Sequence, residues 1–489
     1  MSFRSRLKNP ALFIEAALVG GEWLATGPGG ERLEVRNPST GEVIGHVPAL
    51  SAAQVTEAVE AAEQSWPAWR ALPAAARATL LEKWHDAMLA NADDLALIMT
   101  MEQGKPLAEA KGEIGYGATF VKWFAEEARR MRGDTIPAPT ADRRILVLKQ
   151  PVGVSAAITP WNFPNAMITR KAAPAFAAGC PIVIKPSELT PFSALAIAKL
   201  ALDVGFPPGV ISVVTGLPSE VGGVLTGHTA VRKLSFTGST GVGRLLMKQC
   251  ADTVKRLSFE LGGNAPFIVF DDADLDAAIA GVMASKFRNA GQTCVCANRI
   301  LVQAGIHDRF VERLAGAIAA LKVGDGLEAG VTLGPLINDA AVGKVLAHTE
   351  DALSHGAKAV IGGKAHERGG RFVQPTLVTG ATLDMRFAQE ETFGPLAPIF
   401  KFGEEKEAIE IANGTPYGLA SYFYTEDLRR SWRVAEALEF GMVGLNTGSV
   451  SMECAPFGGI KQSGLGREGS HLGIDEYLEA KSFHIGGLD

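Results

Sequence analysis

The stretch that decides the fold reads Val231-Arg-Lys-Leu-Ser-Phe-Thr-Gly-Ser-Thr-Gly-Val-Gly243. An apolar run, Val231–Phe236, leads into a glycine-rich turn and then into the helical segment Arg244–Asp252. A strand, a glycine turn and a helix in this order point backbone N–H groups and a helix N-terminus at an anion. The glycines follow G-x-x-G-x-G and not G-x-G-x-x-G, so an ordinary β–α turn stays open as the alternative to a dinucleotide site.

Short apolar runs alternate with helical segments on both sides of this turn, which predicts parallel βαβ units and hence the α/β class. The N-terminal third instead carries helical spacing, with Ser51 and Gln54 as a capping box. A second α/β block follows Gly262–Gly263, which we take as the domain boundary. The expected strands are Val152–Ile158, Pro181–Ile184, Val210–Val214, Val231–Phe236, Leu257–Leu261, Ala265–Phe270, Arg299–Val302, Ala359–Gly362 and Leu396–Phe402. The expected helices are Ala74–Leu89, Ala92–Gln103, Ile114–Met131, Pro191–Val204, Asp272–Phe287, His307–Leu321 and Lys406–Ala412.

Two further segments fit neither block. Thr135–Pro151 contains the β-compatible run Ile145–Leu148, and Tyr477–Leu488 follows the last helical signals. Both are predicted to be exposed strands whose edges need a partner chain to cover them.

Composition narrows the class of protein. The 489 residues carry a formal net charge of −6, and at ~150 residues per domain they predict two or three domains. No basic block offers a footprint for nucleic acid, and no apolar stretch reaches the ~20 residues that a bilayer requires. Five scattered cysteines, an odd number, favour a reducing cytoplasm over a disulfide framework. The sequence contains no H-x-x-x-H or C-x-x-C pair, so it predicts no metal site.

Three residues are candidates for nucleophilic catalysis. Cys294 lies on a turn between a predicted helix and a predicted strand, which suits a nucleophile; a buried structural cysteine is the alternative. Glu260 ends an apolar strand, where burial raises a carboxyl pKa toward that of a general base, unless its head reaches solvent or pairs with Arg256. Asn162 lies between two prolines, where its amide could donate to an oxyanion or simply make a turn.

Lys185 and Glu188 follow the predicted strand Pro181–Ile184. They therefore belong at the carboxyl edge of the sheet, where open α/β sheets bind ligands. A carboxylate there accepts both hydroxyls of an adenosine ribose and repels a 2′-phosphate. A solvated charge pair on a loop is the alternative.

Taken together, these segments resemble the NAD(P)-dependent aldehyde dehydrogenase superfamily, from about Gly21 to the C-terminus. The resemblance rests on seven motifs in the family's order, namely Thr159–Pro164, Ile184–Glu188, Phe236–Gly243, Phe259–Gly263, Gly291–Cys294, Glu390–Pro395 and Pro456–Gly459. It implies a Rossmann-type cofactor domain, an α/β catalytic domain and a small β oligomerisation arm. The implied boundaries are 1–133 and 152–261 for the NAD-binding domain, with 463–473 returning to it, 262–462 for the catalytic domain, and 134–151 and 474–489 for the oligomerisation strands.

The resemblance also implies a covalent mechanism, with Cys294 as the nucleophile, Glu260 as the base and Asn162 as the oxyanion donor. The thiolate adds to the aldehyde, hydride passes to the nicotinamide, and water activated by the base hydrolyses the thioester. Cofactor contacts are implied for Thr159, Pro160, Trp161, Lys185, Ser187, Glu188, Gly238, Ser239, Gly243, Leu261, Glu391 and Phe393. Glu188 favours NAD, with NADP as the alternative.

Within the superfamily, the likeness is greatest to succinate-semialdehyde dehydrogenases, through Asn162–Lys171, Gly291–Arg299 and Lys461–Ser470. This likeness implies that Arg170, Arg288 and Ser451 bind the distal carboxylate of a small carboxylated aldehyde. The alternative is that Arg288 caps its helix and Arg170 is a surface charge. Glutarate semialdehyde is the nearest rival substrate, since one methylene is worth only ~1–3 kcal/mol of discrimination.

Cys296 carries a separate hypothesis, because members of this subfamily with the same Cys-x-Cys spacing close a reversible disulfide that silences the nucleophile. A second buried thiol is the alternative. The resemblance further implies a cytoplasmic homo-oligomer, a dimer or tetramer. A non-catalytic protein of the same fold stays open as an alternative, although the intact Cys294, Glu260 and Asn162 argue against it. A phosphorylating or CoA-dependent dehydrogenase is a further alternative, and the presence of Glu260 argues against it because such an enzyme has little use for a deacylating base.

Overall fold

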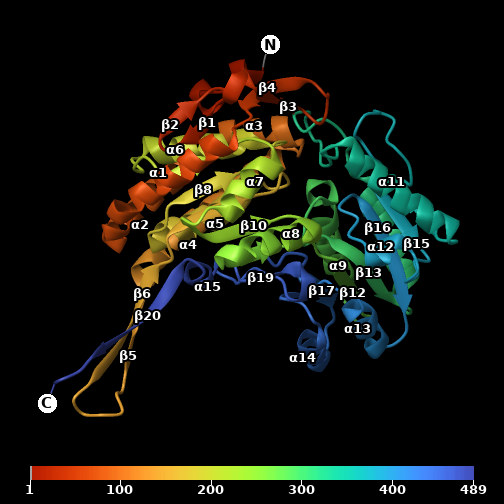
Figure 1. The fold of residues 1–489 in the computed structure, drawn as a ribbon. Helices are drawn as coiled ribbons and strands as arrows, with labels where there is room; N and C mark the ends of the chain where they lie inside the picture. The colour runs from red at the N-terminus through yellow and green to blue at the C-terminus, as the bar shows by residue number, and fades with distance from the viewer. Residues whose placement is uncertain (1–2, 489) are drawn as a thin grey trace.

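Two large β-sheets organise residues 3–488, the part of the chain that this computed structural model describes (Figure 1). The first sheet has eight strands in the order β19-β11-β10-β7-β8-β9-β1-β2, and the second has seven in the order β14-β15-β16-β13-β12-β17-β18. Within this range a three-stranded sheet forms a projecting arm, and a two-stranded ribbon pairs β3 (Arg32–Arg36) with β4 (Val43–Pro48). The α/β class is confirmed.

The first sheet is parallel through its centre. Its strands are β7 (Val154–Ile158), β8 (Ile182–Lys185), β9 (Ile211–Val213), β10 (Val231–Thr237) and β11 (Arg256–Glu260), with β1 (Ala17–Val19), β2 (Glu22–Leu24) and β19 (Gly464–Leu465) antiparallel at the edges. The chain runs outward from β7 to β9 and then returns to the other side of β7 as β10. The carboxyl ends of β7 and its neighbours therefore flank a topological switch point, where open α/β sheets bind ligands.

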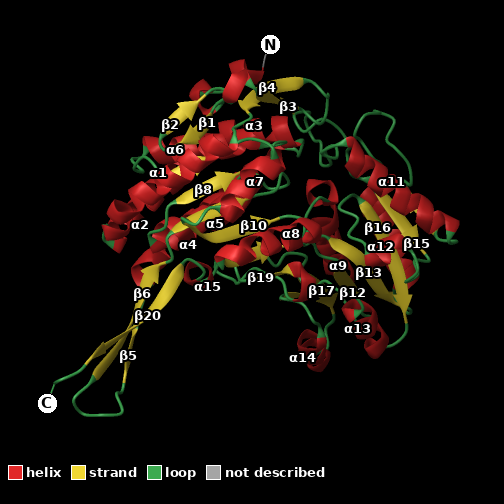
Figure 2. Ribbon diagram, in the orientation of Figure 1, coloured by secondary structure: helices red, strands yellow, loops and turns green. Residues whose placement is uncertain are grey.

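Helices cover both faces of this sheet (Figure 2). Apolar side chains of α1, α7 and α8 share one buried cluster with the sheet, and those of α2 to α6 share another. The helices are α1 (Ala52–Ala71), α2 (Ala74–Ala90), α3 (Ala92–Gln103), α4 (Leu107–Glu127), α5 (Ala166–Ala178), α6 (Pro191–Asp203), α7 (Pro218–Gly227) and α8 (Thr240–Cys250). The Ser51–Gln54 capping box is confirmed. The helix expected from Ile114 instead begins at Leu107, because Pro106 has the fixed backbone angle that precedes a helix.

The second sheet is also mostly parallel. It consists of β12 (Ala265–Val269), β13 (Ala297–Gln303), β15 (Thr376–Thr379), β16 (Leu396–Phe402), β17 (Ala420–Tyr424) and β18 (Met442–Leu445), with β14 (Lys358–Ile361) antiparallel at one edge. Its helices are α9 (Leu275–Val282), α10 (His307–Ala319), α11 (Asp339–Ser354), α12 (Arg386–Gln389), α13 (Glu405–Asn413) and α14 (Leu428–Ala437). The helix expected over Asp272–Phe287 is α-helical only as far as Val282 and continues as a π-helical turn, Met283–Phe287.

Short 3-10 turns complete the described chain. They are Phe3–Arg6, Pro10–Leu12, Pro28–Gly30, Ala128–Arg130, Ala251–Thr253, Arg288–Gly291 and Lys461–Ser463. None of the helices within residues 3–488 combines the length and the apolar character needed to span a membrane.

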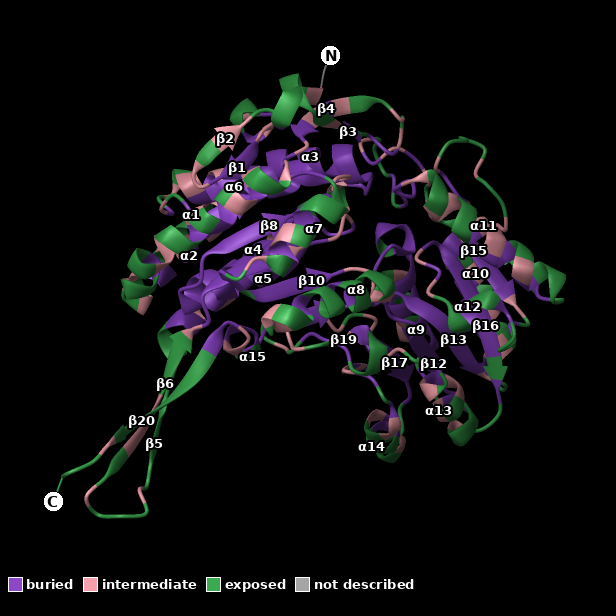
Figure 3. Ribbon diagram, viewed as in Figure 1, coloured by how far each residue is buried: buried purple, intermediate pink, exposed green. Residues whose placement is uncertain are grey.

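The projecting arm corrects one expectation. β6 (Arg144–Pro151) pairs antiparallel with β20 (Leu478–Ile485) along its whole length, and β5 (Asp134–Ile136) lies on the other side of β6. The two predicted strand segments therefore cover one edge of each other. Among residues 3–488, the outer edges of β5 and β20 have no strand partner, and neither does the part of β6 after Val147 on the β5 side. Figure 3 shows that the arm is largely exposed. The short helix α15 (Leu472–Asp475) leads the chain into β20.

The chain returns to the first sheet near its end. β19 pairs with β11 so that Gly464 lies opposite Glu260, and the Leu261 N–H donates to the Ser463 carbonyl at 2.9 Å. Gly464 has φ of +137°, and a Cβ atom there would lie 1.9 Å from the Phe259 carbonyl oxygen. Only glycine fits this close approach of two backbones.

We expect Gly464→Ala to lower the free energy of unfolding by about 1–3 kcal/mol, because the added methyl group forces β19 away from β11. The melting temperature measures this change, and activity should fall with it because β11 ends at Glu260. Gly343→Ala is the control: its Cβ would meet no neighbour within 4 Å on α11, and alanine should be neutral or stabilising in a helix. Equal melting temperatures for Gly464→Ala and the parent would contradict the expectation.

Candidate active site

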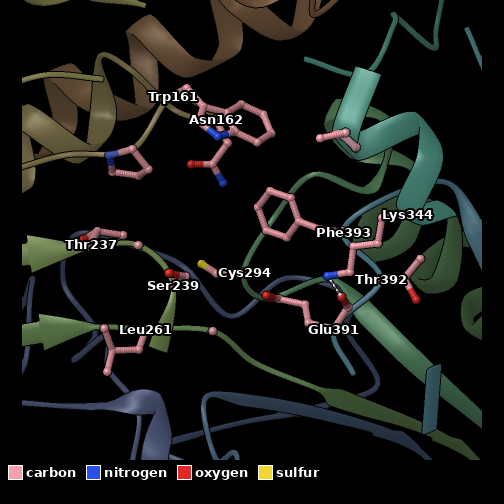
Figure 4. Close-up of a pocket in the computed structure, with 15 residues that line it drawn as sticks. Trp161, Asn162, Thr237, Ser239, Leu261, Cys294, Lys344, Glu391, Thr392 and Phe393 are labelled. Carbon is pink, nitrogen blue, oxygen red and sulfur yellow. Dashed lines mark hydrogen bonds between the residues drawn. The ribbon is translucent and has the colours of Figure 1, made fainter. Parts of the chain in front are cut away.

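The candidate site is a cavity of about 360 Å³ at the switch point of the first sheet, facing loops of the second (Figure 4). The loops after β7, β10 and β11 supply one wall, and the loop before β16 and the start of α11 supply the other. The cavity is lined by Pro160, Trp161, Asn162, Thr237, Gly238, Ser239, Leu261, Gly262, Cys294, Ala340, Ala341, Lys344, Glu391, Thr392 and Phe393. Residues from most of the quoted motifs therefore meet in one place.

The glycine-rich turn has the form expected of an anion site. Ser239 is the N-cap of α8, and its hydroxyl accepts from the Val242 N–H at 3.4 Å. The helix N-terminus thus opens at the cavity and offers N–H groups to a pyrophosphate. Gly243 has another function: a Cβ atom there would lie 2.5 Å from the Leu261 side chain, so glycine lets α8 pack closely on β11. These residues fit a dinucleotide.

Lys185, Glu188, Ser187 and Thr159 lie at the same carboxyl edge but outside the lining of this cavity. The Lys185 ammonium lies 3.4 Å from the Glu188 carboxylate, which is 40% exposed. Thr159 is held beside β8, since its N–H donates to the Lys185 carbonyl at 3.0 Å. The Ser187 hydroxyl accepts from the Leu189 N–H at 3.2 Å. Because the Glu188 carboxylate is exposed, a ribose can reach it.

Glu391 and Phe393 close the cavity from the second sheet. The Glu391 carboxylate accepts from the Gly263 N–H at 3.2 Å, and burial raises its pKa to about 7. Lys344 donates to the Glu391 backbone carbonyl, the dashed line in Figure 4. The Phe393 ring meets Trp161 edge-to-face at 5.6 Å between centroids. The two aromatic rings therefore join the walls that the two sheets supply.

Cys294 follows a turn with unusual backbone angles. Asn289 and Ala290 have φ near +50°, and Gly291 has φ of +75°. A Cβ atom at Gly291 would lie 2.3 Å from the Gly394 carbonyl oxygen, so only glycine lets the chain pass. The Cys294 thiol is half-buried, and this burial raises its pKa to about 12, although Arg170 and Arg288 oppose the shift. Without a ligand the thiol form predominates at neutral pH.

Asn162 is buried beside the nucleophile loop. Its side-chain amide donates to the Gln292 carbonyl at 3.0 Å, and its Oδ1 has no hydrogen-bond partner among residues 3–488. Because the amide carries two N–H donors, one remains for an oxyanion in the cavity. The role of Asn162 as an oxyanion donor stays a prediction.

Glu260 is buried at the end of β11, and its Oε2 has no hydrogen-bond partner within the described chain. Burial, and then the nearby Glu468, raises its pKa well above the usual range. The solvent-exposed alternative is wrong, and so is the pairing with Arg256, which instead contacts Glu479 and the Leu478 carbonyl. A buried carboxyl group with a raised pKa suits a general base.

Cys294 also lines a second, smaller hollow on the side away from the Ser239 turn. Its lining is Tyr116, Phe163, Met167, Arg170, Arg288, Thr293, Cys294, Val295, Ser451 and Phe457. The three residues expected to bind a carboxylate are thus brought together next to Cys294. The Tyr116 hydroxyl contacts the Ser451 hydroxyl across this hollow. Sequence reasoning missed Tyr116, because no motif lies near it in the chain.

The two arginines of this hollow differ. Arg170 is buried, with its guanidinium 2.8 Å from the Glu468 carboxylate and 3.9 Å from the centre of the Phe457 ring. It is therefore neither a surface charge nor an unpaired cation. Arg288 is exposed, lies over the Phe163 ring at 5.2 Å, and makes no ion pair with any residue between 3 and 488. Arg288 is the cation available to an incoming anion.

Cys296 lines neither of these two cavities. It is buried, and the Lys286 ammonium donates to its sulfur at 3.4 Å. All five cysteines are free thiols here. The reversible disulfide with Cys294 stays a prediction.

The geometry can be compared with known proteins. A model of the aldehyde dehydrogenase family matches residues 23–483. The chain belongs to the aldehyde dehydrogenase family. This aldehyde dehydrogenase is 59% identical to succinate-semialdehyde dehydrogenase [NADP(+)] GabD of Escherichia coli K12, over 98% of the chain and 100% of that protein.

Two further comparisons agree. The aldehyde dehydrogenase is 59% identical to glutarate-semialdehyde dehydrogenase of Pseudomonas aeruginosa, over 99% of the chain and 100% of that protein. Its fold matches the crystal structure of succinate-semialdehyde dehydrogenase from Burkholderia pseudomallei with a TM-score of 0.97 and 59% identity, covering 98% and 99% of the two chains. The resemblance read from the motifs is confirmed at the level of the family.

The raised pKa of Cys294 can be tested directly. We expect the rate of iodoacetamide alkylation at Cys294 to rise nearly tenfold per pH unit between about pH 7 and pH 10, because the thiolate is a minor species throughout. Mass analysis of the Cys294 peptide in a Cys454→Ser background measures this rate, since Cys454 is exposed. A rate that levels off below about pH 9 would show that the thiol is not suppressed by burial.

Proposed function

We propose that this aldehyde dehydrogenase oxidises succinate semialdehyde to succinate with NAD(P)+. The observation that carries the proposal is Arg288, an unpaired cation in the hollow that shares Cys294 with the cofactor-sized cavity. Because Cys294 and Arg288 line the same hollow, a substrate with an aldehyde at one end and a carboxylate at the other would meet both residues. The names of the two relatives, one acting on succinate semialdehyde and one on glutarate semialdehyde, support the same class.

The chain's own residues supply the covalent chemistry. The Cys294 thiolate adds to the aldehyde carbon and forms a tetrahedral thiohemiacetal, whose oxyanion receives N–H groups from Asn162 and the Cys294 backbone. Residues of the Ser239 turn and the Glu391 loop would hold a nicotinamide, which would accept the hydride that the thiohemiacetal loses as it becomes a thioester on Cys294. Glu260 in its carboxylate form then takes a proton from the water that hydrolyses the thioester, and the raised pKa of this buried group makes that carboxylate a stronger base.

The buried carboxyl group of Glu260 argues against a non-catalytic protein and against an acyl-transferring dehydrogenase. A non-catalytic protein of this fold has no need for a carboxyl group held at a raised pKa, and an enzyme that passes its acyl group to phosphate or CoA has little use for a water-activating base. Glutarate semialdehyde stays the nearest rival, because the same Arg288 would bind its carboxylate and one methylene costs only ~1–3 kcal/mol.

Three coarser features complete the proposal. NAD is the preferred cofactor because the Glu188 carboxylate repels a 2′-phosphate, even though one close relative is named for NADP(+). The protein acts in the cytoplasm. It forms a homo-oligomer, a dimer or tetramer, in which a second copy of the chain covers the open edges of β5 and β20. The domain boundaries given above divide the chain into cofactor-binding, catalytic and oligomerisation parts.

The arginine can be tested by a neutral replacement of similar length. We expect Arg288→Met to lower kcat/KM for succinate semialdehyde about 10- to 150-fold, the value of a hydrogen-bonded charge pair. For propanal, which has no carboxylate, kcat/KM should change less than about threefold. Arg309→Met, on the exposed face of α10, controls for loss of a surface charge. Equal losses for the charged and the uncharged aldehyde would rule out carboxylate binding by Arg288.

Glu188 can be tested in the same way. We expect Glu188→Gln to raise the ratio of kcat/KM with NADP+ to that with NAD+ by about tenfold or more, because it removes the charge that repels the 2′-phosphate. Steady-state rates at fixed aldehyde measure the ratio, and Glu63→Gln on the exposed face of α1 is the control. An unchanged ratio would mean that Glu188 does not select the cofactor.

A further inference from the structure

A buried ion pair lies directly behind the Asn162 loop. Lys105 and Glu113 come from the corner between α3 and α4, and both side chains are only 1% exposed. The Lys105 ammonium contacts the Glu113 carboxylate, donates to the Asn162 carbonyl at 2.8 Å and lies 4.1 Å from the centre of the Phe163 ring. All three of its N–H groups therefore face a partner, and two of the three partners are in the Asn162 loop.

Glu113 holds the other end of the same loop. Its second carboxylate oxygen accepts from the N–H groups of Asn165 and Ala166, at 3.0 and 3.2 Å, where α5 begins. The pair thus fixes the loop on both sides of Phe163. Burying two charges costs several kcal/mol unless geometry and hydrogen bonds compensate, and here most of the compensating bonds are to the loop backbone.

The corner also contacts the nucleophile loop. Gln103 donates to the Asn289 side chain at 2.9 Å, and the Asn289 amide donates to the Asn162 carbonyl at 3.0 Å. Glu109 accepts from the Asn289 N–H at 2.8 Å. The Asn162 carbonyl therefore receives one bond from Lys105 and one from the loop that ends at Cys294.

We infer that Lys105, paired with Glu113, is a positioning residue for the oxyanion donor. It fixes the Asn162 backbone, so that the side-chain amide meets the oxyanion that forms beside Cys294 without reorganising. This inference rests on the proposed function of Asn162. Preorganised donors are effective because they pay no reorganisation cost during the reaction.

A double-mutant cycle tests the inference. Asn162→Ala should lower kcat/KM about 100- to 1000-fold, as loss of one oxyanion donor does. Lys105→Met, which keeps the length of the side chain, should lower kcat/KM about 10- to 100-fold in the parent but less than about threefold in the Asn162→Ala background, because positioning has no value once the amide is gone. Both losses should appear in kcat, with KM for the cofactor unchanged.

Arg77→Met is the matched control, because Arg77 is also a buried cation that donates to backbone carbonyls, those of Leu72 and Ala177. It should lower the melting temperature and leave kcat/KM within about twofold. If Lys105→Met does not fold, Glu113→Gln replaces it in the same cycle. Equal fold-losses in both backgrounds would overturn the inference and leave the role of Asn162 intact, whereas an unchanged kcat/KM for Asn162→Ala would overturn the proposed role of Asn162 itself.

Discussion

Burial of Glu260 and Cys294, the two groups proposed to react, is the constraint on which the rest of this structure depends. Loss of hydration holds the proton on both Cys294 and Glu260, and an unpaired charge in such surroundings costs several kcal/mol. The chain meets this constraint with polar groups drawn from distant segments. Arg170 and Lys171 arrive on α5 and Glu468 from the C-terminal return, and Lys171 forms an ion pair with Glu468. Catalysis then requires a substrate or cofactor that lowers the pKa values of Cys294 and Glu260 where they react.

The same constraint separates two arginines that look equivalent. Arg170 shares the Glu468 carboxylate with Lys171, and its charge lowers the pKa of Glu260 against the larger effect of burial. Arg288 follows the π-helical turn and begins a 3-10 turn, so its side chain leaves the regular helix surface and stays exposed at the hollow. A π-turn at the end of a helix often marks a functional site because it re-aims side chains. Arg170 is thus held in an ion pair within the protein, whereas Arg288 is available to a ligand.

Local sequence predicted the elements better than their arrangement. Helix α3 and strand β16 begin and end where the patterns placed them, since caps and apolar runs are local. The sequence patterns did not predict β15 and β17, because short strands buried on both faces lack an alternating pattern. They also missed β18, which is only four residues long. In the site, the motifs located Cys294, Glu260 and Asn162. They could not supply the Glu468 contact, 297 positions beyond Lys171, or Lys105, because such pairs depend on the tertiary fold.

The return of the chain to the first sheet has a consequence for biosynthesis. Strand β11 is complete when residue 260 has left the ribosome, but its edge partner β19 is made about 200 residues later. At typical elongation of ~5–20 residues per second, that edge waits roughly 10–40 s. The delay between synthesis of β6 and synthesis of its partner β20 is longer still. The nascent chain therefore carries open strand edges until translation nears its end, so the surroundings of Glu260 and the projecting arm form together and only after the last segment is released.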